Sequence, residues 1–96
     1  MTTRISVQID FHSTIQNVFG EKSTGITLSS PLTVRNLLEA LCTSSERRKR
    51  IFEDTERLRG DLTILRNGRN IVFLAGLDTV LDNGDKIAIF PPVTGG

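Results

Sequence analysis

One strongly amphipathic segment, from Thr33 to Cys42, limits what this chain can fold into. Thr33 is a good helix N-cap, because its hydroxyl can accept a hydrogen bond from a backbone N–H of the first turn. The apolar residues that recur at the spacing of one helix face are Val34, Leu37, Leu38, Leu41 and Cys42. A single helix of this kind covers one face of a small sheet, so we expect the other face to meet solvent.

The remaining apolar residues predict short strands. Residues 5–11 alternate between apolar and polar side chains, which is the pattern of a half-buried strand. Further strands are expected at 26–29, 62–66, 71–74 and 86–90, with Asn67-Gly68 as a two-residue hairpin turn. The segment 13–25 is expected to be a connection, such as a long hairpin loop, and the segment 75–81 is expected to be irregular. The charged segment 46–55 is expected to form a second helix.

These elements predict an α+β fold, with a mixed sheet of four to five strands, one main helix and a short second helix. Alternate residues of a strand face opposite sides of the sheet. The side chains expected on the uncovered side are Leu65, Phe90 and either the pair Val72 and Leu74 or the pair Ile71 and Phe73. We expect an apolar docking patch there that includes Leu65 and Leu74, unless the long connection or the second helix covers it.

The composition indicates one domain with a single core. The chain has 96 residues, of which 38% are hydrophobic and 24% charged. A net charge of +1 implies no long-range attraction to nucleic acid or to an anionic membrane. No apolar run is long enough to span a bilayer, and the N-terminus lacks a signal-peptide core, so the expected compartment is cytoplasmic. We expect a domain over residues 1–90 and an extended tail over 91–96.

The residues with reactive side chains do not form a catalytic arrangement, so we expect no enzyme and no metal site. Cys42 is the only cysteine and is expected to be an inert core thiol. His12 is the only histidine and is expected at the surface. The basic run 47–50 lies among acidic residues and is expected to be a solvated helix face. The chain has no glycine-rich phosphate loop, so it is not expected to bind ATP itself.

The C-terminus says most about function. The last strand runs directly into the sequence Phe90-Pro91-Pro92-Val93-Thr94-Gly95-Gly96. The two prolines fix φ and favour an extended conformation, and the two glycines let the backbone approach another surface closely. The tail is therefore expected to be a stiff stalk with a slim tip and a free carboxylate, which suits entry into another protein's active site.

The segment from Asn83 to Gly96, with its Phe-Pro-Pro-Val-x-Gly-Gly ending, resembles the C-terminus of the MoaD/ThiS ubiquitin-like sulfur carriers. It is most similar to the MoaD branch, the small subunits of molybdopterin synthase. The Thr-Val-x-x-Leu-Leu-x-x-Leu helix and the Asn-Gly hairpin extend the resemblance more loosely over the chain. The resemblance implies a β-grasp fold, with the first and last strands parallel and adjacent, and implies that the carboxylate of Gly96 is the working group.

The resemblance also implies partners. A ubiquitin-activating-type adenylyltransferase, MoeB-like or ThiF-like, would use ATP and Mg²⁺ to adenylate Gly96. A sulfur donor would then displace AMP, and the resulting thiocarboxylate would supply sulfur inside a MoaE-like large subunit during molybdenum cofactor biosynthesis. The expected partner-binding residues are Phe90, Pro91, Pro92, Val93, Thr94 and Gly95. Among these, Phe90 and Val93 are the expected apolar anchors.

Two alternatives remain open. In the first, the chain is a ubiquitin-like modifier whose Gly96 forms isopeptide bonds to lysines, or a carrier for another thiolation pathway such as that of thiamine or tRNA. The sequence does not separate this from the sulfur carrier, because both begin with the same adenylate. In the second, the chain is a non-covalent β-grasp interaction module, for which loss of Gly95 and Gly96 would leave function intact.

Overall fold

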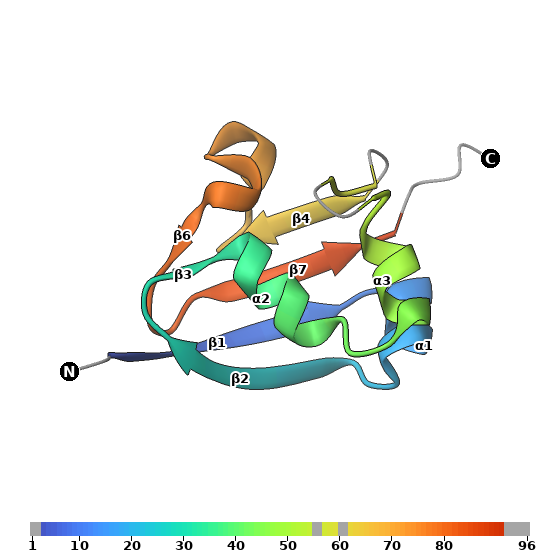
Figure 1. Ribbon diagram of the computed structural model, residues 1–96, viewed down its shortest axis with the longest axis horizontal. Coiled ribbons are helices and arrows are strands. Elements are labelled where there is room, and N and C mark those ends of the chain that lie inside the picture. The colour runs from blue at the N-terminus through green and yellow to red at the C-terminus, as the bar shows by residue number, and fades with distance from the viewer. Residues whose placement is uncertain (1–2, 55–56, 60–61, 92–96) are drawn as a thin grey trace.

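The computed structural model describes residues 3–54, 57–59 and 62–91 of the chain (Figure 1). The strands are β1 (Arg4–Phe11), β2 (Ser23–Ser29), β3 (Leu32–Thr33), β4 (Thr63–Arg66), β5 (Arg69–Asn70), β6 (Val80–Leu81) and β7 (Lys86–Phe90). The α-helices are α1 (Thr14–Phe19), α2 (Val34–Leu41) and α3 (Ser45–Ile51), and two 3₁₀ turns, η1 (Ile71–Phe73) and η2 (Gly76–Asp78), follow β5.

The central feature of the fold is a five-stranded sheet with the strand order β2-β1-β7-β4-β5. Strand β1 pairs in parallel with β7, so that Ile9 lies opposite Ile87, whereas the other pairs in this sheet are antiparallel. Strands β3 and β6 form a separate two-stranded sheet. The parallel pairing of the first and last strands confirms the expected β-grasp arrangement.

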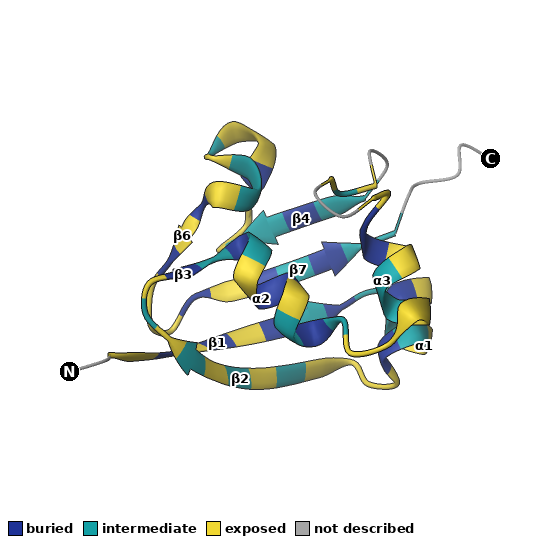
Figure 2. Cartoon of the chain, in the orientation of Figure 1, coloured by how far each residue is buried: buried dark blue, intermediate teal, exposed yellow. Residues whose placement is uncertain are grey.

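The hydrophobic core lies between this sheet and the helices, which cover one of its faces (Figure 1). The predicted main helix is confirmed, because the hydroxyl of Thr33 accepts from the N–H of Asn36 at 3.2 Å. The buried residues of α2 are Val34, Leu37, Leu38 and Leu41. Figure 2 shows buried and exposed residues alternating around this helix. Cys42 ends the helix and is half-buried at the edge of the core.

The prediction that residues 13–25 form a loop connection was wrong. Helix α1 occupies part of this segment, and β2 begins at Ser23. The helix forms because Ile15 and Phe19, four residues apart, share one face and both enter the core. The ring of Phe19 stacks on that of Phe11 at 4.5 Å between centroids, and Gly20 ends the helix with φ of 77°.

The prediction of a returning strand at 71–74 was also wrong. The predicted Asn67-Gly68 turn is present, with positive φ at both residues, but β5 ends after only Arg69 and Asn70. The side chain of Asn70 accepts from the N–H of Val72 and so begins the turn η1. Two more elements, η2 and β6, fall in the segment 75–81 that was expected to be irregular.

The charged second helix is present but shorter than predicted. It runs from Ser45 to Ile51 with Ser44 as its N-cap, because Ser44 Oγ accepts from the N–H of Arg47 at 3.2 Å. Phe52 leaves the helix and pairs with Leu58 through an isolated β-bridge. Both Ile51 and Phe52 are buried, so they anchor this helix to the core.

The second face of the five-stranded sheet carries half-buried or exposed side chains. Strand register places Ser6, Gln8 and Asp10 of β1 on this outer face, and Ala88 and Leu65 lie opposite each other on it. Among the described residues of this face, none is buried. Within the described part of the chain, no helix is long and apolar enough to cross a membrane.

A carboxylate holds together the end of the sheet that is remote from the C-terminus. Asp85 accepts from Arg66 Nε at 2.8 Å, from Asn67 Nδ2 at 2.9 Å and from the N–H of Asp82 at 2.7 Å. Burial raises the pKa of Asp85, but these hydrogen bonds and the Arg66 charge outweigh it. The pKa of this carboxyl group therefore lies below its ordinary value.

We predict that Leu38→Ala lowers the free energy of unfolding by about 2–5 kcal/mol, because it opens a cavity under α2. Leu38 is fully buried. Urea unfolding followed by circular dichroism measures this change. The matched control is Val80→Ala, since Val80 is 58% exposed, and it should change the free energy by less than about 0.5 kcal/mol. Equal effects of the two variants would contradict the packing described above.

We predict that Asp85→Asn makes stability less dependent on acid. A carboxyl group whose pKa is lowered by folding stabilises the native state above its unfolded pKa of about 4, and the stabilisation is lost as pH falls through the lower folded value. Below about pH 4, the free energy of unfolding should therefore fall less steeply in Asp85→Asn than in the wild type. Urea titrations at a series of pH values test this, and a decline as steep in Asp85→Asn as in the wild type would contradict it.

Candidate functional site at the end of the central strand

The C-terminal tail follows the central strand of the five-stranded sheet. Strand β7 lies between β1 and β4, with Ile89 opposite Phe11 on one side and Phe90 opposite Thr63 on the other. The N–H of His12 donates to the carbonyl of Ile89 at 3.1 Å, which extends the pairing beyond the end of β1. The backbone is therefore held on both sides up to the residue before the prolines.

Phe90 is fixed by a stacking contact that the sequence did not predict. The rings of His12 and Phe90 lie 4.1 Å apart between centroids, with planes inclined by 12°. Both side chains are half-buried at the end of the sheet. His12 was expected only at the surface, because the resemblance implied that the first and last strands are adjacent but did not give the register that brings His12 against Phe90. The stack leaves part of the Phe90 ring available to another molecule.

Pro91 is the last described residue and is half-buried. A proline has no N–H, so it ends the pairing of β7 with its neighbours. The other predicted tail residues, Pro92, Val93, Thr94, Gly95 and Gly96, lie outside the described residues, and their roles stay predictions. Five residues follow Pro91, so the terminal carboxylate can reach at most about 17 Å beyond it.

The two residues predicted for the docking patch lie on different elements. Leu65 is half-buried on the outer face, opposite Ala88 and on the same face as Phe90. Leu74 follows η1 and lines a shallow hollow of about 260 Å³ with Arg66, Asn67 and Arg69. The most exposed large apolar side chains are Val72, Phe73 and Val80, at 74%, 80% and 58%. The docking patch therefore stays a prediction.

The basic run of α3 is only partly a solvated face, because Arg47 joins three elements. Its guanidinium donates to the carbonyls of Leu41 at 3.3 Å and Phe19 at 3.2 Å, and lies 5.0 Å from the centroid of the Phe19 ring. These contacts tie the ends of α1 and α2 to α3. Lys49 and Arg50 are exposed, as expected. Part of this basic run therefore holds the helices together. The spacing of its residues in the sequence did not indicate this role.

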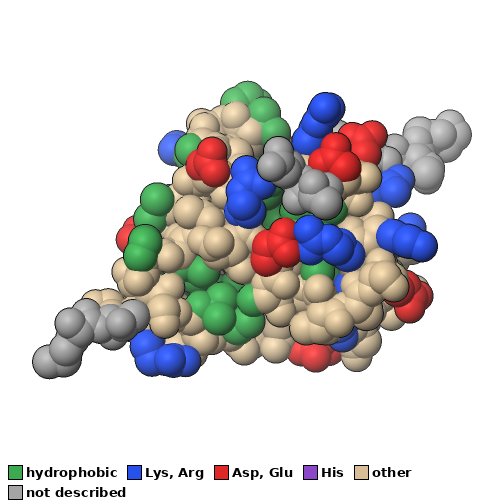
Figure 3. All heavy atoms as spheres, in the orientation of Figure 1, with side chains coloured by type: hydrophobic (Ala, Val, Ile, Leu, Met, Phe, Trp, Pro, Cys, Tyr) green, Lys and Arg blue, Asp and Glu red, His purple; other side chains and the backbone are tan. Residues whose placement is uncertain are grey.

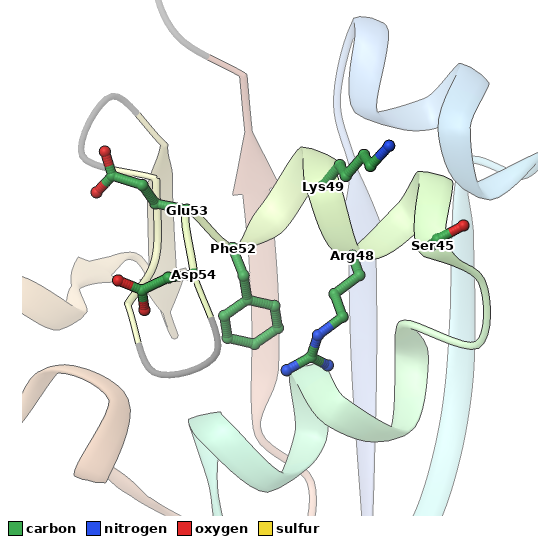
Figure 4. A pocket seen from close by; sticks show the side chains of 6 residues that line it. All are labelled: Ser45, Arg48, Lys49, Phe52, Glu53 and Asp54. Carbon is green, nitrogen blue, oxygen red and sulfur yellow. The ribbon is translucent and has the colours of Figure 1, made fainter.

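A hollow of about 270 Å³ lies beside α3 (Figure 4). Its lining residues are Ser45, Arg48, Lys49, Phe52, Glu53 and Asp54. Arg48 lies 4.8 Å over the Phe52 ring and makes two hydrogen bonds, of 2.6 and 3.0 Å, to Glu39. These bonds lower the pKa of Glu39. Because Lys49 lies on one flank and the acidic pair on the other, the hollow favours neither sign of charge (Figure 4).

Cys42 is the one described thiol and is placed unfavourably for chemistry. Burial raises its pKa to about 11, so the thiol stays protonated near neutral pH. A protonated thiol is a poor nucleophile, which agrees with the expected inert role. Within residues 3–54, 57–59 and 62–91, no group of three or more His, Cys, Asp or Glu side chains is arranged to hold a metal ion.

Comparison with known proteins places the whole chain among small carriers and modifiers. The model of the ThiS family matches residues 11–96. The chain is 34% identical over 93 residues to small archaeal modifier protein 3 of Haloferax volcanii, a match that covers 96% of this chain and 100% of that protein.

Solved structures agree. The crystal structure of small archaeal modifier protein 1 from Haloferax volcanii matches with a TM-score of 0.81 at 29% identity, and the match covers 95% of this chain and 99% of that one. A putative molybdopterin converting factor, subunit 1, from Pyrococcus furiosus matches with a TM-score of 0.73 at 27% identity, covering 93% and 99%. The chain belongs to the ThiS family of ubiquitin-like β-grasp proteins, which are non-catalytic carriers and modifiers rather than enzymes.

Proposed function

We propose that this chain is a ubiquitin-like protein modifier, activated at the carboxylate of Gly96 and transferred to lysine side chains. The observation that carries the proposal is its match over 96% of its length to the whole of a small archaeal modifier protein. The Gly95-Gly96 ending supports it, because a terminus without side chains can enter a narrow active site. This reading replaces the molybdopterin synthase subunit as the first choice.

The chemistry requires only a free carboxylate from this chain. A carboxylate is a poor acyl donor, because its leaving group would be oxide. A carboxylate oxygen of Gly96 attacks the α-phosphorus of ATP, pyrophosphate leaves, and a mixed anhydride with AMP results. The ε-amine of a lysine then attacks the carbonyl carbon, AMP leaves, and an isopeptide bond forms with release of a proton. A ubiquitin-activating-type enzyme would supply ATP and Mg²⁺, in the cytoplasm.

The geometry around β7 supports presentation of the tail to such an enzyme. Phe90 is held by strand pairing and by the His12 ring, so the direction in which the chain leaves the sheet is fixed. Because Phe90 is already held in place, fewer backbone torsions are frozen when the tail enters its site, and this lowers the conformational entropy cost of binding. We propose that Phe90 and Leu65 contact the activating enzyme and that residues 91–95 lie in the channel that leads to its active site.

A second candidate function is the small subunit of molybdopterin synthase. Its support is the Phe-Pro-Pro-Val-x-Gly-Gly ending together with the match to the Pyrococcus furiosus protein. In this candidate, a sulfide-equivalent donor displaces AMP from the same adenylate and leaves a thiocarboxylate on Gly96. That sulfur would be transferred inside a MoaE-like large subunit. Both candidates share the first step and differ in the nucleophile that resolves the adenylate.

The modifier proposal predicts lysine conjugates of this chain. In cells that carry its activating enzyme, tagged wild-type chain should give high-mass species that survive boiling with a thiol reductant. Trypsin cleaves after Lys86, so acceptor lysines should carry residues 87–96 as a branch, which mass spectrometry identifies. Deletion of Gly96 should abolish the conjugates and leave the melting temperature unchanged, whereas Val80→Ala should keep them. Conjugates that persist without Gly96 would contradict the proposal.

The sulfur-carrier candidate predicts a different product from the same adenylate. Purified chain, incubated with the activating enzyme, ATP, Mg²⁺ and sulfide, should gain the mass of one oxygen-to-sulfur replacement at Gly96. The matched control is the chain without Gly96, which should gain nothing. Thiocarboxylate without conjugates in cells favours the synthase subunit, and conjugates with or without thiocarboxylate favour the modifier. If neither product forms with an enzyme that is active on another carrier, the non-covalent module is favoured.

A further inference from the structure

One edge of the five-stranded sheet is long and uncharged. Strand β2 is the outermost strand on the β1 side, and among the described residues no strand pairs with its outer edge. It spans seven residues, Ser23–Ser29, with no charged residue and no proline between these ends. Proteins usually protect such an edge with a charge, a proline or a short strand, because unpaired backbone groups recruit other strands.

The hydrogen bonds at both ends of β2 show which of its backbone groups point outward. Phe11 N–H donates to Lys22 O at 2.8 Å, and Ser30 N–H donates to Thr3 O at 2.7 Å. In an antiparallel pair, residues bonded to the neighbouring strand alternate with residues whose N–H and C=O point away. The residues with outward backbone groups are therefore Ser23, Gly25, Thr27 and Ser29.

This edge is open to a neighbour. These four residues are all exposed and have small side chains. One outward acceptor, Thr27 O, is approached by Arg4 Nη2 at 3.4 Å, which leaves a second lone pair on that oxygen. On the opposite, helix-covered face, Ile26 and Leu28 are half-buried against the core. Figure 3 shows hydrophobic side chains gathered beside α2 on the side toward β1 and β2.

The other edge of the sheet is protected. Strand β5 has only two residues, Arg69 and Asn70, and the chain then turns into η1. A short strand with a charged side chain offers little for another strand to pair with. The two edges of this sheet therefore differ, because β5 is protected and β2 is open.

We propose that β2 pairs antiparallel with β2 of a second copy of this chain, which joins the two sheets into one. Full overlap of the seven residues puts the two-fold axis at Ile26, with Ser23 opposite Ser29 of the other copy and Gly25 opposite Thr27. Every outward N–H and C=O of the edge then meets a partner. No like charges face each other, and the two Ile26 side chains meet as a non-hydrogen-bonded pair, where side chains lie closest.

The partner is a second copy of this chain because the β2 edge is complementary to itself. A foreign strand would need its own matching pattern, whereas the uncharged β2 sequence matches itself by symmetry. Pairing consumes the open edge of each copy and leaves only the protected β5 edges, so association stops at two copies. Strand β1 separates β7 from this edge strand in the sheet, so the interface does not use the start of either C-terminal tail.

Sedimentation equilibrium of the full chain from micromolar to millimolar concentration tests the proposal. The apparent mass should rise with concentration from 10.6 kDa toward twice that value and no further. Ser23→Lys with Ser29→Lys brings like charges together across the axis and should weaken the dimer by at least about tenfold. Ser23→Lys with Ser29→Glu brings opposite charges together and should keep the dimer within about threefold of the wild type.

Three outcomes would overturn this inference. The first is a single-chain mass for the wild type at every concentration. The second is equal weakening by the two double variants, since both add charge to the strand but only one opposes like charges. The third is growth beyond the dimer. Circular dichroism melts of both variants establish that the sheet itself stays folded, and the test requires no activating enzyme, so its outcome is independent of the proposed function.

Discussion

The parallel pairing of β1 with β7 is the contact on which the rest of the structure depends. It joins the first and last strands of the domain, and it divides the sheet so that β2 lies on one side and β4 and β5 on the other. The pairs Ile9–Ile87 and Phe11–Ile89 sit under the helices and are buried on both strands. Without β7 the two halves of the sheet would have no common neighbour. The C-terminal tail therefore follows directly after the strand that joins the two halves of the sheet.

That placement separates stability from chemistry. An enzyme active site often contains strained or unpaired buried groups, and these lower the stability of the fold. Here every buried side-chain N or O atom of the described residues has a hydrogen-bond partner. Asp85 is satisfied by three donors, and the thiol of Cys42 is kept protonated. In the proposed function the reacting carboxylate belongs to the terminus, so the packing of the domain does not have to accommodate an active site.

The sequence predicted the elements that local rules determine. The α2 face, its Thr33 cap and the Asn67-Gly68 turn follow from spacing and from backbone preference, and the structure contains all three. The apolar run at 71–74 suits a strand equally well by composition, but the Asn70 cap turns it into η1, and this outcome depends on where β5 loses its neighbour. The stacking of His12 on Phe90 needs the register of two strands that are distant in sequence, so no local pattern could have revealed it.

The two candidate functions place their differences away from the tail. Both candidate functions need an activating enzyme to bind the same terminus, so the start of the tail at Phe90 has to serve either function. Selection between a lysine and a sulfur donor must then come from surfaces that later partners contact. The exposed side chains of η1, Val72 and Phe73, and the exposed residues beside the α3 hollow, Lys49, Glu53 and Asp54, are such surfaces. A modifier also presents its surface after attachment, when the carboxylate of Gly96 has become part of the isopeptide bond, so its folded domain remains available for other proteins to recognise.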